Sequence, residues 1–279
     1  MKSIEKFVNQ LYINNLSFTH TLPSLEKSGM FADGMFKLLF PIGTNADIPM
    51  EQQIEVDARK MQCLLKEVLL PLHSQLDTEI DIIVDKFFEQ LPDVFEELLK
   101  DAQVILQFDP AAYSVEEVVA AYPGFYAICI YRLSHILYKM GVPLLPRMIS
   151  EHAHSRTAID INPGAQIGPQ FFIDHGTGVV IGETCIIGRN VKIYQCVTLG
   201  ALNVSKELAQ KKRHPTIEDN VIVYSGSTIL GGNTVVGHDS IVGGNVWLTK
   251  SVDPYSLIYN RSETKIRSLD IEEEITFVI

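Results

Sequence analysis

The sequence lacks the features that mark membrane, secreted and nucleic-acid-binding proteins. No window approaches the run of about 18 apolar residues that a membrane-spanning helix needs. The segment after Met1, KSIEKFVNQ, carries charges where the apolar core of a signal peptide would stand. Asp and Glu number 34 against 23 Lys and Arg, so the net charge is −11 and no basic surface for nucleic acid is expected. We therefore expect no membrane partner and no nucleic-acid partner.

Cysteine is scarce and scattered. The four cysteines are Cys63, Cys129, Cys185 and Cys196, and no two of them form a CxxC pair. In a chain of 279 residues this usage is typical of reduced thiols in a cytoplasmic protein. A hydrophobic content of 46% is ample for one large core or two modest ones.

The first half of the chain has the periodicity of helices. Apolar residues recur at three- and four-residue spacing through 51–76 and through 77–106, as they do along one face of a helix. Pro92 is expected to kink or break the second of these helices. Ser114, with a glutamate three residues later, has the pattern of a helix N-cap, and Gly141 has that of a helix end.

From about Ala158 the aliphatic residues recur every six positions instead. They are Ile161, Ile167, Ile173, Ile181, Ile187, Ile193, Leu199, Ile217, Val223, Leu230, Val236 and Val242. Within each run the spacing is six, except for an eight-residue step at 173–181 and a seven-residue step at 223–230. This period fits neither a helix nor an alternating strand. It predicts a parallel β-helix of triangular section, with one short strand per side and about 18 residues per coil.

The two periods divide the chain. We predict an α + β fold, with an all-helical N-terminal domain at 1–155, a β-helix domain at 156–255 and a C-terminal tail at 256–279. The helical half is expected to cover one end of the β-helix, because a solenoid needs a cap. A charged loop at 201–215, ALNVSKELAQKKRHP, leaves the repeat and returns to it, as functional loops often do.

Polar residues gather where the repeat breaks. Asp174 and His175 stand inside the eight-residue step, and Asp160 precedes His175 by 15 residues, a little short of one coil. Asp160 is therefore expected beside His175, where it would orient the imidazole as a general base. Arg213 and His214 offer donors for a carboxylate, and Asp174 offers an anion for an ammonium group.

A zinc site is the competing interpretation of the histidines. Trimers of β-helices can hold zinc through three histidines, but such a site needs closely spaced ligands. His152 and His154 precede the repeat, and His175, His214 and His238 have no short ligand spacing. We therefore expect no metal. A turn histidine and a solvated KKRH segment remain the simpler alternative for each residue taken alone.

Six stretches of the sequence resemble the serine acetyltransferases, which make O-acetylserine from serine and acetyl-CoA in the first step of cysteine biosynthesis. They are DPAA (109–112), GFYAICIYRLSH (124–135), DINPGAQIG (160–168), IDHGTGVVIGET (173–184), VTLGA (197–201) and RHPTIEDNV (213–221). The resemblance runs from about Asp109 to Lys250, roughly half of the chain. The order of the DHGTG, GET and RHP motifs is more specific than the six-residue repeat, which many acyltransferases share.

The resemblance implies a left-handed parallel β-helix and a set of site residues. His175 is implied as the general base for direct transfer, with Asp160 as its partner. The implied serine-binding residues are Asp109, Asp174, Arg213 and His214, with Glu183 in support. The implied contacts of the acetyl-CoA co-substrate are Gly200, Ala201, Ser225, Gly226 and Gly243. Two segments depart from the family pattern, the charged residues of the 201–215 loop and NRSETK at 260–265.

The resemblance also implies partners. Members of the family form trimers that often pair into hexamers, with active sites between neighbouring β-helices. A C-terminal isoleucine, here Ile279, often inserts into O-acetylserine sulfhydrylase, and a free terminal carboxylate suits capture by backbone donors.

Two alternatives stay open at this point. One is another branch of the hexapeptide acyltransferases, with a sugar or homoserine as acceptor. The other is a non-catalytic scaffold that binds a sulfhydrylase through Ile279.

Overall fold

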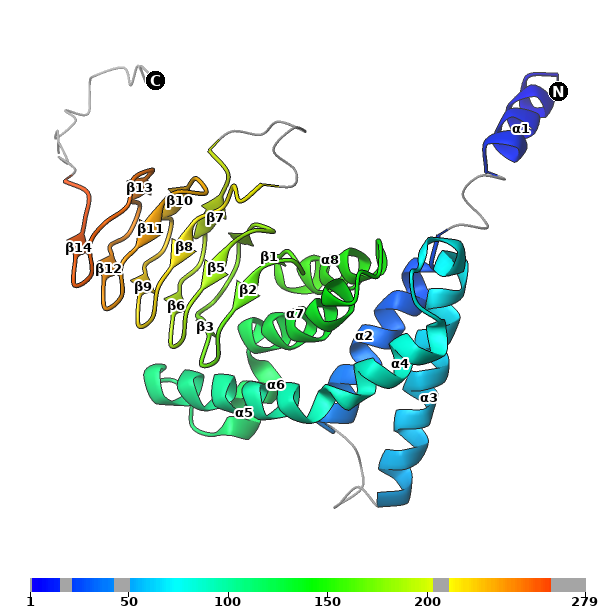
Figure 1. Cartoon of the computed structure of the whole chain (residues 1–279), viewed down its shortest axis with the longest axis horizontal. Coiled ribbons are helices and arrows are strands. Elements are labelled where there is room, and N and C mark those ends of the chain that lie inside the picture. The colour runs from blue at the N-terminus through cyan, green and yellow to red at the C-terminus, as the bar shows by residue number, and fades with distance from the viewer. Residues whose placement is uncertain (1, 16–21, 43–50, 203–210, 262–279) are drawn as a thin grey trace, which may run out of the picture.

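A computed structural model describes residues 2–15, 22–42, 51–202 and 211–261, in which a helical half is followed by a parallel β-helix (Figure 1). The helices are α1 (Lys2–Asn15), α2 (Leu25–Leu39), α3 (Glu51–Leu69), the 3-10 helix η1 (Leu70–Gln75), α4 (Ile80–Glu89), α5 (Leu91–Phe108), α6 (Val115–Ala121), α7 (Pro123–Lys139) and α8 (Leu145–Thr157). Among the described residues no helix is both long and apolar enough to cross a membrane. Ile279, most of the tail and the middle of the 201–215 loop lie outside the described residues.

The predicted helix boundaries are confirmed at three positions. Pro92 breaks the helical run, because α4 ends at Glu89 and the proline stands in the first turn of α5. The Ser114 hydroxyl accepts a hydrogen bond from the backbone N–H of Glu117 at 3.1 Å, as an N-cap residue does. Gly141 follows α7 with a φ of +74°, the left-handed conformation of a helix end.

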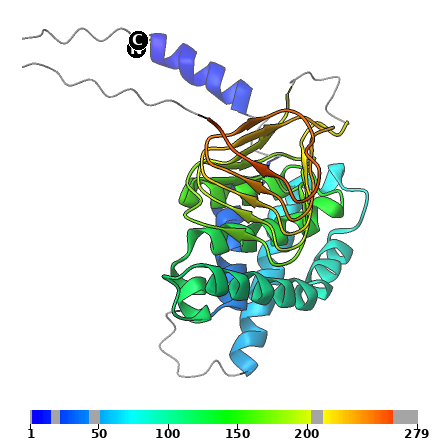
Figure 2. The same cartoon turned by 90° about the vertical axis from the view of Figure 1, so that its left-hand side faces the viewer.

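Within the described residues, fourteen strands build three parallel sheets that wrap into a triangular prism, seen closer to end-on in Figure 2. Sheet A holds β1 (Ile159–Ile161), β4 (Val179–Ile181), β7 (Thr198–Gly200), β10 (Thr228–Leu230) and β13 (Trp247–Leu248). Sheet B holds β2 (Gln166–Ile167), β5 (Ile186–Ile187), β8 (Thr216–Ile217) and β11 (Val235–Val236). Sheet C holds β3 (Phe172–Ile173), β6 (Lys192–Ile193), β9 (Ile222–Val223), β12 (Ile241–Val242) and β14 (Leu257–Ile258). We name the three edges of the prism CA, AB and BC after the sheets that meet there.

The six-residue repeat fills the centre of the prism, with one correction. Ile229, not Leu230, is the inward residue of β10: it is fully buried and pairs with Leu199, whereas Leu230 pairs with Gly200. The seven-residue step therefore falls between Ile229 and Val236, and Gly231 takes it up with a φ of +104°. Ile229 and Leu230 are both aliphatic, so the six-residue period alone does not distinguish them. A shift by one residue exchanges the inward and outward faces of the strand.

The helical half covers the first coil through a buried ion pair. Arg132 of α7 donates to Asp101 of α5 at 2.7 Å, and both side chains are almost wholly buried. The same guanidinium donates to the carbonyl of Gly168 at 2.9 Å, and Asp101 accepts from the backbone N–H of Phe171 at 2.8 Å. A Cβ at Gly124, at the start of α7, would overlap the carbonyl oxygen of Ile173. The helices α5 and α7 are therefore fixed directly to the coil that carries Asp174 and His175.

Candidate active site

The eight-residue step forms a widened turn at edge CA. From Ile173 to Ile181 the chain uses two residues more than at the same edge of the next coil, where Ile193 to Leu199 is a step of six. Gly176 takes a φ of +79° in this turn, and a Cβ there would overlap the side chain of Ile159. The turn can therefore run this close to the coil only with glycine at that position.

The widened turn buries most of the Asp174 side chain and exposes most of the His175 side chain. The side chain of Asp174 is 17% exposed and that of His175 is 72% exposed. His175 has a φ of +54°, in the left-handed region that residues other than glycine seldom adopt. Its Nδ1 lies 3.7 Å from Oδ1 of Asp174, so the imidazole has an acidic neighbour and an open side.

Asp109 and Asp174 face the same space. Asp109 follows the end of α5, and its Oδ2 accepts a hydrogen bond from the Tyr122 hydroxyl at 2.7 Å. Burial raises the pKa of Tyr122 to about 12, and the charges of Asp109 and Asp174 add to this rise. Burial also raises the pKa of Tyr194, again with contributions from both carboxylates. The two carboxylates act on the same pair of tyrosines, so both place negative charge on this part of edge CA.

Glu183 and Arg213 form an ion pair at edge AB. The carboxylate of Glu183 also accepts a hydrogen bond from the hydroxyl of Tyr138, in the last turns of α7, at 3.1 Å. The side chains of Arg213 and Glu183 are 22% and 30% exposed, so the pair is partly buried. Glu183 thereby holds the guanidinium of Arg213 in one place.

The three residues of the GET motif form a cradle for Arg213 and His214. The Thr184 hydroxyl accepts from the backbone N–H of Arg213 at 2.9 Å and from that of His214 at 3.1 Å. A Cβ at Gly182 would overlap the His214 ring, which is 8% exposed. Burial, together with the charges of Arg213 and Lys212, lowers the pKa of His214 to about 4. The motif therefore places a fixed cation beside a neutral imidazole.

The expected hydrogen bond between Asp160 and His175 is absent among the described residues. Asp160 lies in β1 and accepts instead from Arg147 of α8 at 3.0 Å, because α8 packs directly on this strand. The backbone of the widened turn nevertheless lies against the same segment, since Gly178 donates to the carbonyl of Ala158 at 2.8 Å. Asp160 is therefore close in the fold to the turn of His175 but is paired with another residue.

Asp160 also belongs to a group that has the composition of a metal site. Ligand atoms of Glu151, His154 and Asp160 lie within 4.8 Å of one another. Arg147 forms ion pairs with both carboxylates of this group. A guanidinium in that position opposes the binding of a cation, so the group is best described as an ion-pair cluster that fastens α8 to β1.

The implied acetyl-CoA contacts lie at the same two edges. Gly200 is the last residue of β7 and Ala201 follows it at edge AB, whereas Ser225, Gly226 and Gly243 lie at edge CA. The amide of Gly226 donates to Gln195 at 3.0 Å and that of Gly243 donates to Ile258 at 2.7 Å. These two N–H groups are used within the β-helix, so a ligand there would have to contact other backbone groups.

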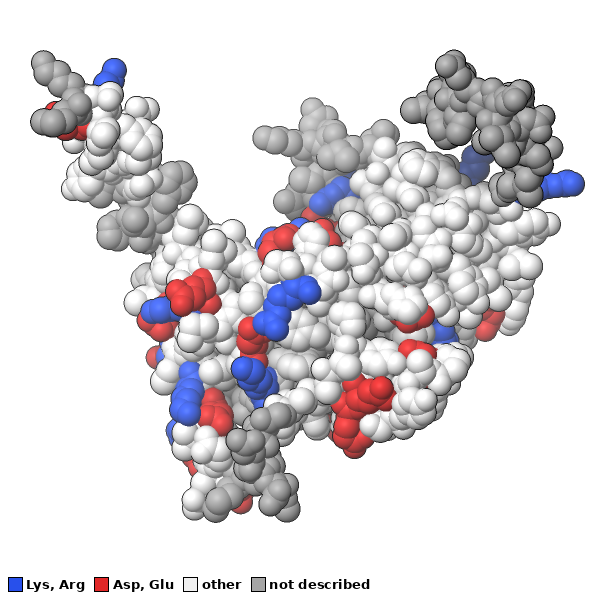
Figure 3. Space-filling view, turned by 180° about the vertical axis from the view of Figure 1, so that it is seen from behind, with Lys and Arg blue, Asp and Glu red and all other residues white. Residues whose placement is uncertain are grey.

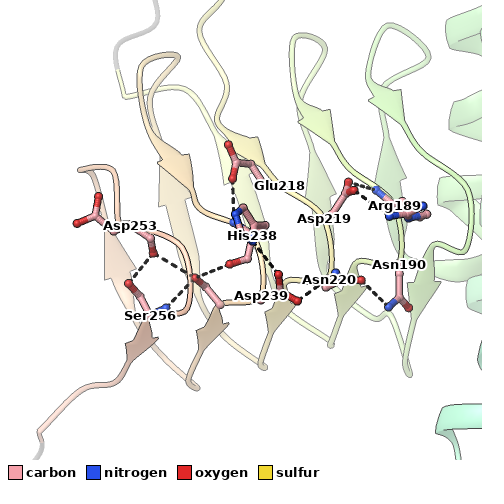
Figure 4. Close-up of polar contacts among 10 residues, drawn as sticks. Arg189, Asn190, Glu218, Asp219, Asn220, His238, Asp239, Asp253 and Ser256 are labelled. Atoms are coloured by element: carbon pink, nitrogen blue, oxygen red, sulfur yellow. Dashed lines mark hydrogen bonds and ion pairs between the residues drawn. The ribbon is translucent and has the colours of Figure 1, made fainter.

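The third edge, BC, holds none of the predicted site residues. Figure 4 shows its ladder of polar side chains, in which Asn190 donates to Asn220 at 2.9 Å and Asn220 donates to Asp239 at 3.1 Å. Each of these three residues has a φ between +57° and +59° at a corner of the coil. Asn and Asp tolerate this conformation, so the ladder has a structural explanation.

Sequence reasoning missed the residues that hold the site together. Tyr122, Tyr138 and Thr184 each bond a predicted site residue, yet none of them has a recognisable spacing to its partner. Thr184 had one available signal, because it lies inside the GET motif. The two tyrosines had none, since their contacts depend on how the helices pack on the first coil.

The chain is similar to known proteins over most of its length. No family model matches the chain. Over 276 residues it is 41% identical to a protein named serine acetyltransferase, plasmid, from Synechococcus elongatus, and the match covers 91% of this chain and 85% of that protein.

Solved structures give the same result. The serine acetyltransferase 1 of Entamoeba histolytica in complex with L-cysteine is 34% identical with a TM-score of 0.75, over 83% of this chain and 86% of that one. A serine acetyltransferase from Brucella abortus in complex with coenzyme A is 26% identical with a TM-score of 0.58, over 91% and 87% of the two chains. The predicted fold, helices followed by a left-handed parallel β-helix, is confirmed.

Proposed function

The chain belongs to the serine acetyltransferase family of acyltransferases, and from that premise we propose that it transfers the acetyl group of acetyl-CoA to the hydroxyl of L-serine. The observation that carries the choice of acceptor is the pairing of an acidic subsite, Asp109 with Asp174, and a donor subsite, Arg213 with His214. An amino acid needs both, because its ammonium group requires anions and its carboxylate requires donors.

His175 is proposed as the general base. The imidazole takes the proton of the serine hydroxyl, the oxygen attacks the thioester carbonyl, and the carbon–sulfur bond breaks as CoA leaves and is protonated. The exposure of His175 supports this role, since the ring is open to a substrate. Asp160 is proposed as its partner once the ring turns toward sheet A, where the widened turn already lies against Ala158.

The acceptor subsites divide the remaining roles. Asp109 and Asp174 are proposed to bind the ammonium group, and Arg213 and His214 the carboxylate. The coenzyme A in the Brucella abortus relative supports acetyl-CoA as the donor. The proposed contacts with CoA remain Gly200, Ala201, Ser225, Gly226 and Gly243, through backbone groups that the β-helix leaves available.

We propose that the complete site forms between neighbouring copies of the chain. His175 lies at edge CA and Arg213 at edge AB, with sheet A between them. A cyclic trimer, alone or paired into a hexamer, would bring edge CA of one copy to edge AB of the next. Figure 3 shows a β-helix surface with few charged side chains, and Val180 and Trp247 of sheet A are exposed, which supports a self-associating surface.

Two further proposals concern location and partners. The four cysteines are free thiols, as a reducing compartment favours, so we propose a cytoplasmic enzyme. A sulfhydrylase partner for Ile279 also stays a proposal.

A panel of acceptors tests the proposed function against its alternatives. The full chain is incubated with acetyl-CoA and, in turn, serine, homoserine, threonine or a galactoside, and thiol release is measured. The proposal predicts that serine gives the highest kcat/KM and that the galactoside gives background rates, because a sugar has neither of the charged groups that the subsites match. Faster release with the galactoside, or no release with any acceptor, would contradict it.

A further inference from the structure

The imidazole ring of His214 accepts a hydrogen bond from a backbone amide. The backbone N–H of Thr184 donates to Nδ1 of His214 at 3.0 Å. A backbone amide can only donate, so Nδ1 must be the accepting nitrogen and carry no proton. The proton of the neutral ring therefore sits on Nε2, which has no hydrogen-bond partner among the described residues.

The hydroxyl of Thr184 uses its full hydrogen-bonding capacity on the same two residues. Its oxygen accepts from the backbone N–H groups of Arg213 and His214, at 2.9 and 3.1 Å. With its lone pairs so used, its own hydrogen is left to donate, and Nδ1 of His214 lies 2.9 Å away. One side chain thus fixes both the backbone of the donor subsite and the orientation of the imidazole.

The charges that face the ring also keep it neutral. Arg213 is its chain neighbour, and the Nζ of Lys212 donates to the carbonyl of His214 at 2.7 Å and to that of Thr184 at 3.0 Å. In the described part of the chain Glu183 is the one acidic group that acts on the ring, and it is engaged with Arg213. Protonation of Nδ1 would set a new N–H against the Thr184 amide, between two cations.

We propose that Thr184 is a positioning residue for the acceptor carboxylate, because it locks His214 in the neutral form that carries its proton on Nε2 and so presents a fixed donor beside Arg213. The inference rests on the proposed function, in which these two residues bind the carboxylate of serine. A neutral donor next to one cation gives the carboxylate a directed hydrogen bond in addition to a charge.

The first test does not depend on activity. In the full chain labelled with nitrogen-15, long-range proton–nitrogen NMR correlations distinguish a protonated from an unprotonated ring nitrogen, and His214→Gln identifies the signals. We expect an unprotonated Nδ1 and a protonated Nε2 for His214 at pH 7. A proton on Nδ1 would overturn the proposal even if the chain acetylates serine.

The second test uses three threonine variants. Thr184→Val removes the hydroxyl and keeps the shape, Thr184→Ser keeps the hydroxyl, and Thr249→Val makes the same change at a half-buried threonine outside the site. We expect Thr184→Val to raise the KM for serine about tenfold while kcat and the KM for acetyl-CoA stay within about twofold. Thr184→Ser and Thr249→Val should leave the KM for serine unchanged.

The pH dependence separates positioning from a general loss of structure. In the wild type His214 stays neutral down to about pH 4, so its NMR signals should not shift between pH 8 and pH 5. In Thr184→Val burial and the charges of Arg213 and Lys212 remain, so His214 should stay neutral over the same range, whereas a ring released by loss of structure would titrate near the ordinary value of about 6.5. An unchanged KM for serine in this variant would overturn the proposal, whereas a wild-type chain that does not acetylate serine would overturn the proposed function instead.

Discussion

At the scale of single residues, His175 lacks the contacts that hold the other histidines of the β-helix in place. His214 is buried against Thr184, and His238 forms a 2.7 Å hydrogen bond with Asp239. His175 is 72% exposed, and its nearest acidic group is 3.7 Å away. The fold therefore gains little from this side chain, which is consistent with a role in chemistry.

The first prediction follows from this exposure. His175→Ala should lower kcat for serine acetylation at least about a hundredfold, because it removes the proposed base, and should leave the KM for acetyl-CoA within about twofold. The melting temperature should not change, since an exposed side chain is removed. His238→Ala, a matched change at edge BC, should keep wild-type turnover. If His175→Ala turned over serine at a near-wild-type rate, a different base would be needed.

At the scale of secondary-structure elements, α7 connects both halves of the proposed site. Its first residues lie against Ile173 and follow Tyr122, which bonds Asp109. Near its end Tyr138 bonds Glu183, and in its middle Arg132 is buried against Asp101. The helix thus contacts edge CA of the first coil and edge AB of the second.

The buried pair on α7 gives a prediction about stability. Asp101→Ala leaves the buried guanidinium of Arg132 and the amide of Phe171 without this partner, and should lower the free energy of unfolding by about 3–5 kcal/mol. Glu97→Gln is the control: Glu97 pairs with the same arginine but is 44% exposed, so its loss should cost below about 1 kcal/mol. Urea denaturation measures both values. Equal stability of the two variants would show that the buried pair does not fasten the helices to the coil.

The same elements show what the sequence can and cannot predict. A solenoid has contacts mainly between successive coils, so its repeat can be recognised in the local sequence, and the repeat predicts the fold. Where two aliphatic residues adjoin, as at Ile229 and Leu230, the period alone could not choose between them. Spacing predicts Asp160 as the partner of His175. Its carboxylate instead accepts from Arg147, because α8 packs on β1, and no local sequence pattern predicts that packing. Motifs suggested the candidate residues, whereas their partners depend on tertiary contacts.

At the scale of the whole molecule, the proposed site is divided between two edges of one prism. A strand of sheet A has three residues in its first coils and spans on the order of 10 Å, longer than a serine molecule. The acidic subsite and His175 lie at edge CA, and Glu183, Arg213 and His214 lie at edge AB. The proposed site therefore requires two neighbouring copies to surround one serine.

Mixing two inactive variants tests this arrangement, and with it the roles of both edges, most directly. His175→Ala should lack the base, and Arg213→Ala should have a strongly raised KM for serine, so each protein alone should be nearly inactive at a serine concentration near the wild-type KM. When the two chains are co-expressed in equal amounts, random assembly should give about a quarter of the sites both wild-type residues. We predict recovery of about a quarter of the wild-type rate, whereas a mixture no more active than its two components would contradict a site shared between neighbouring chains.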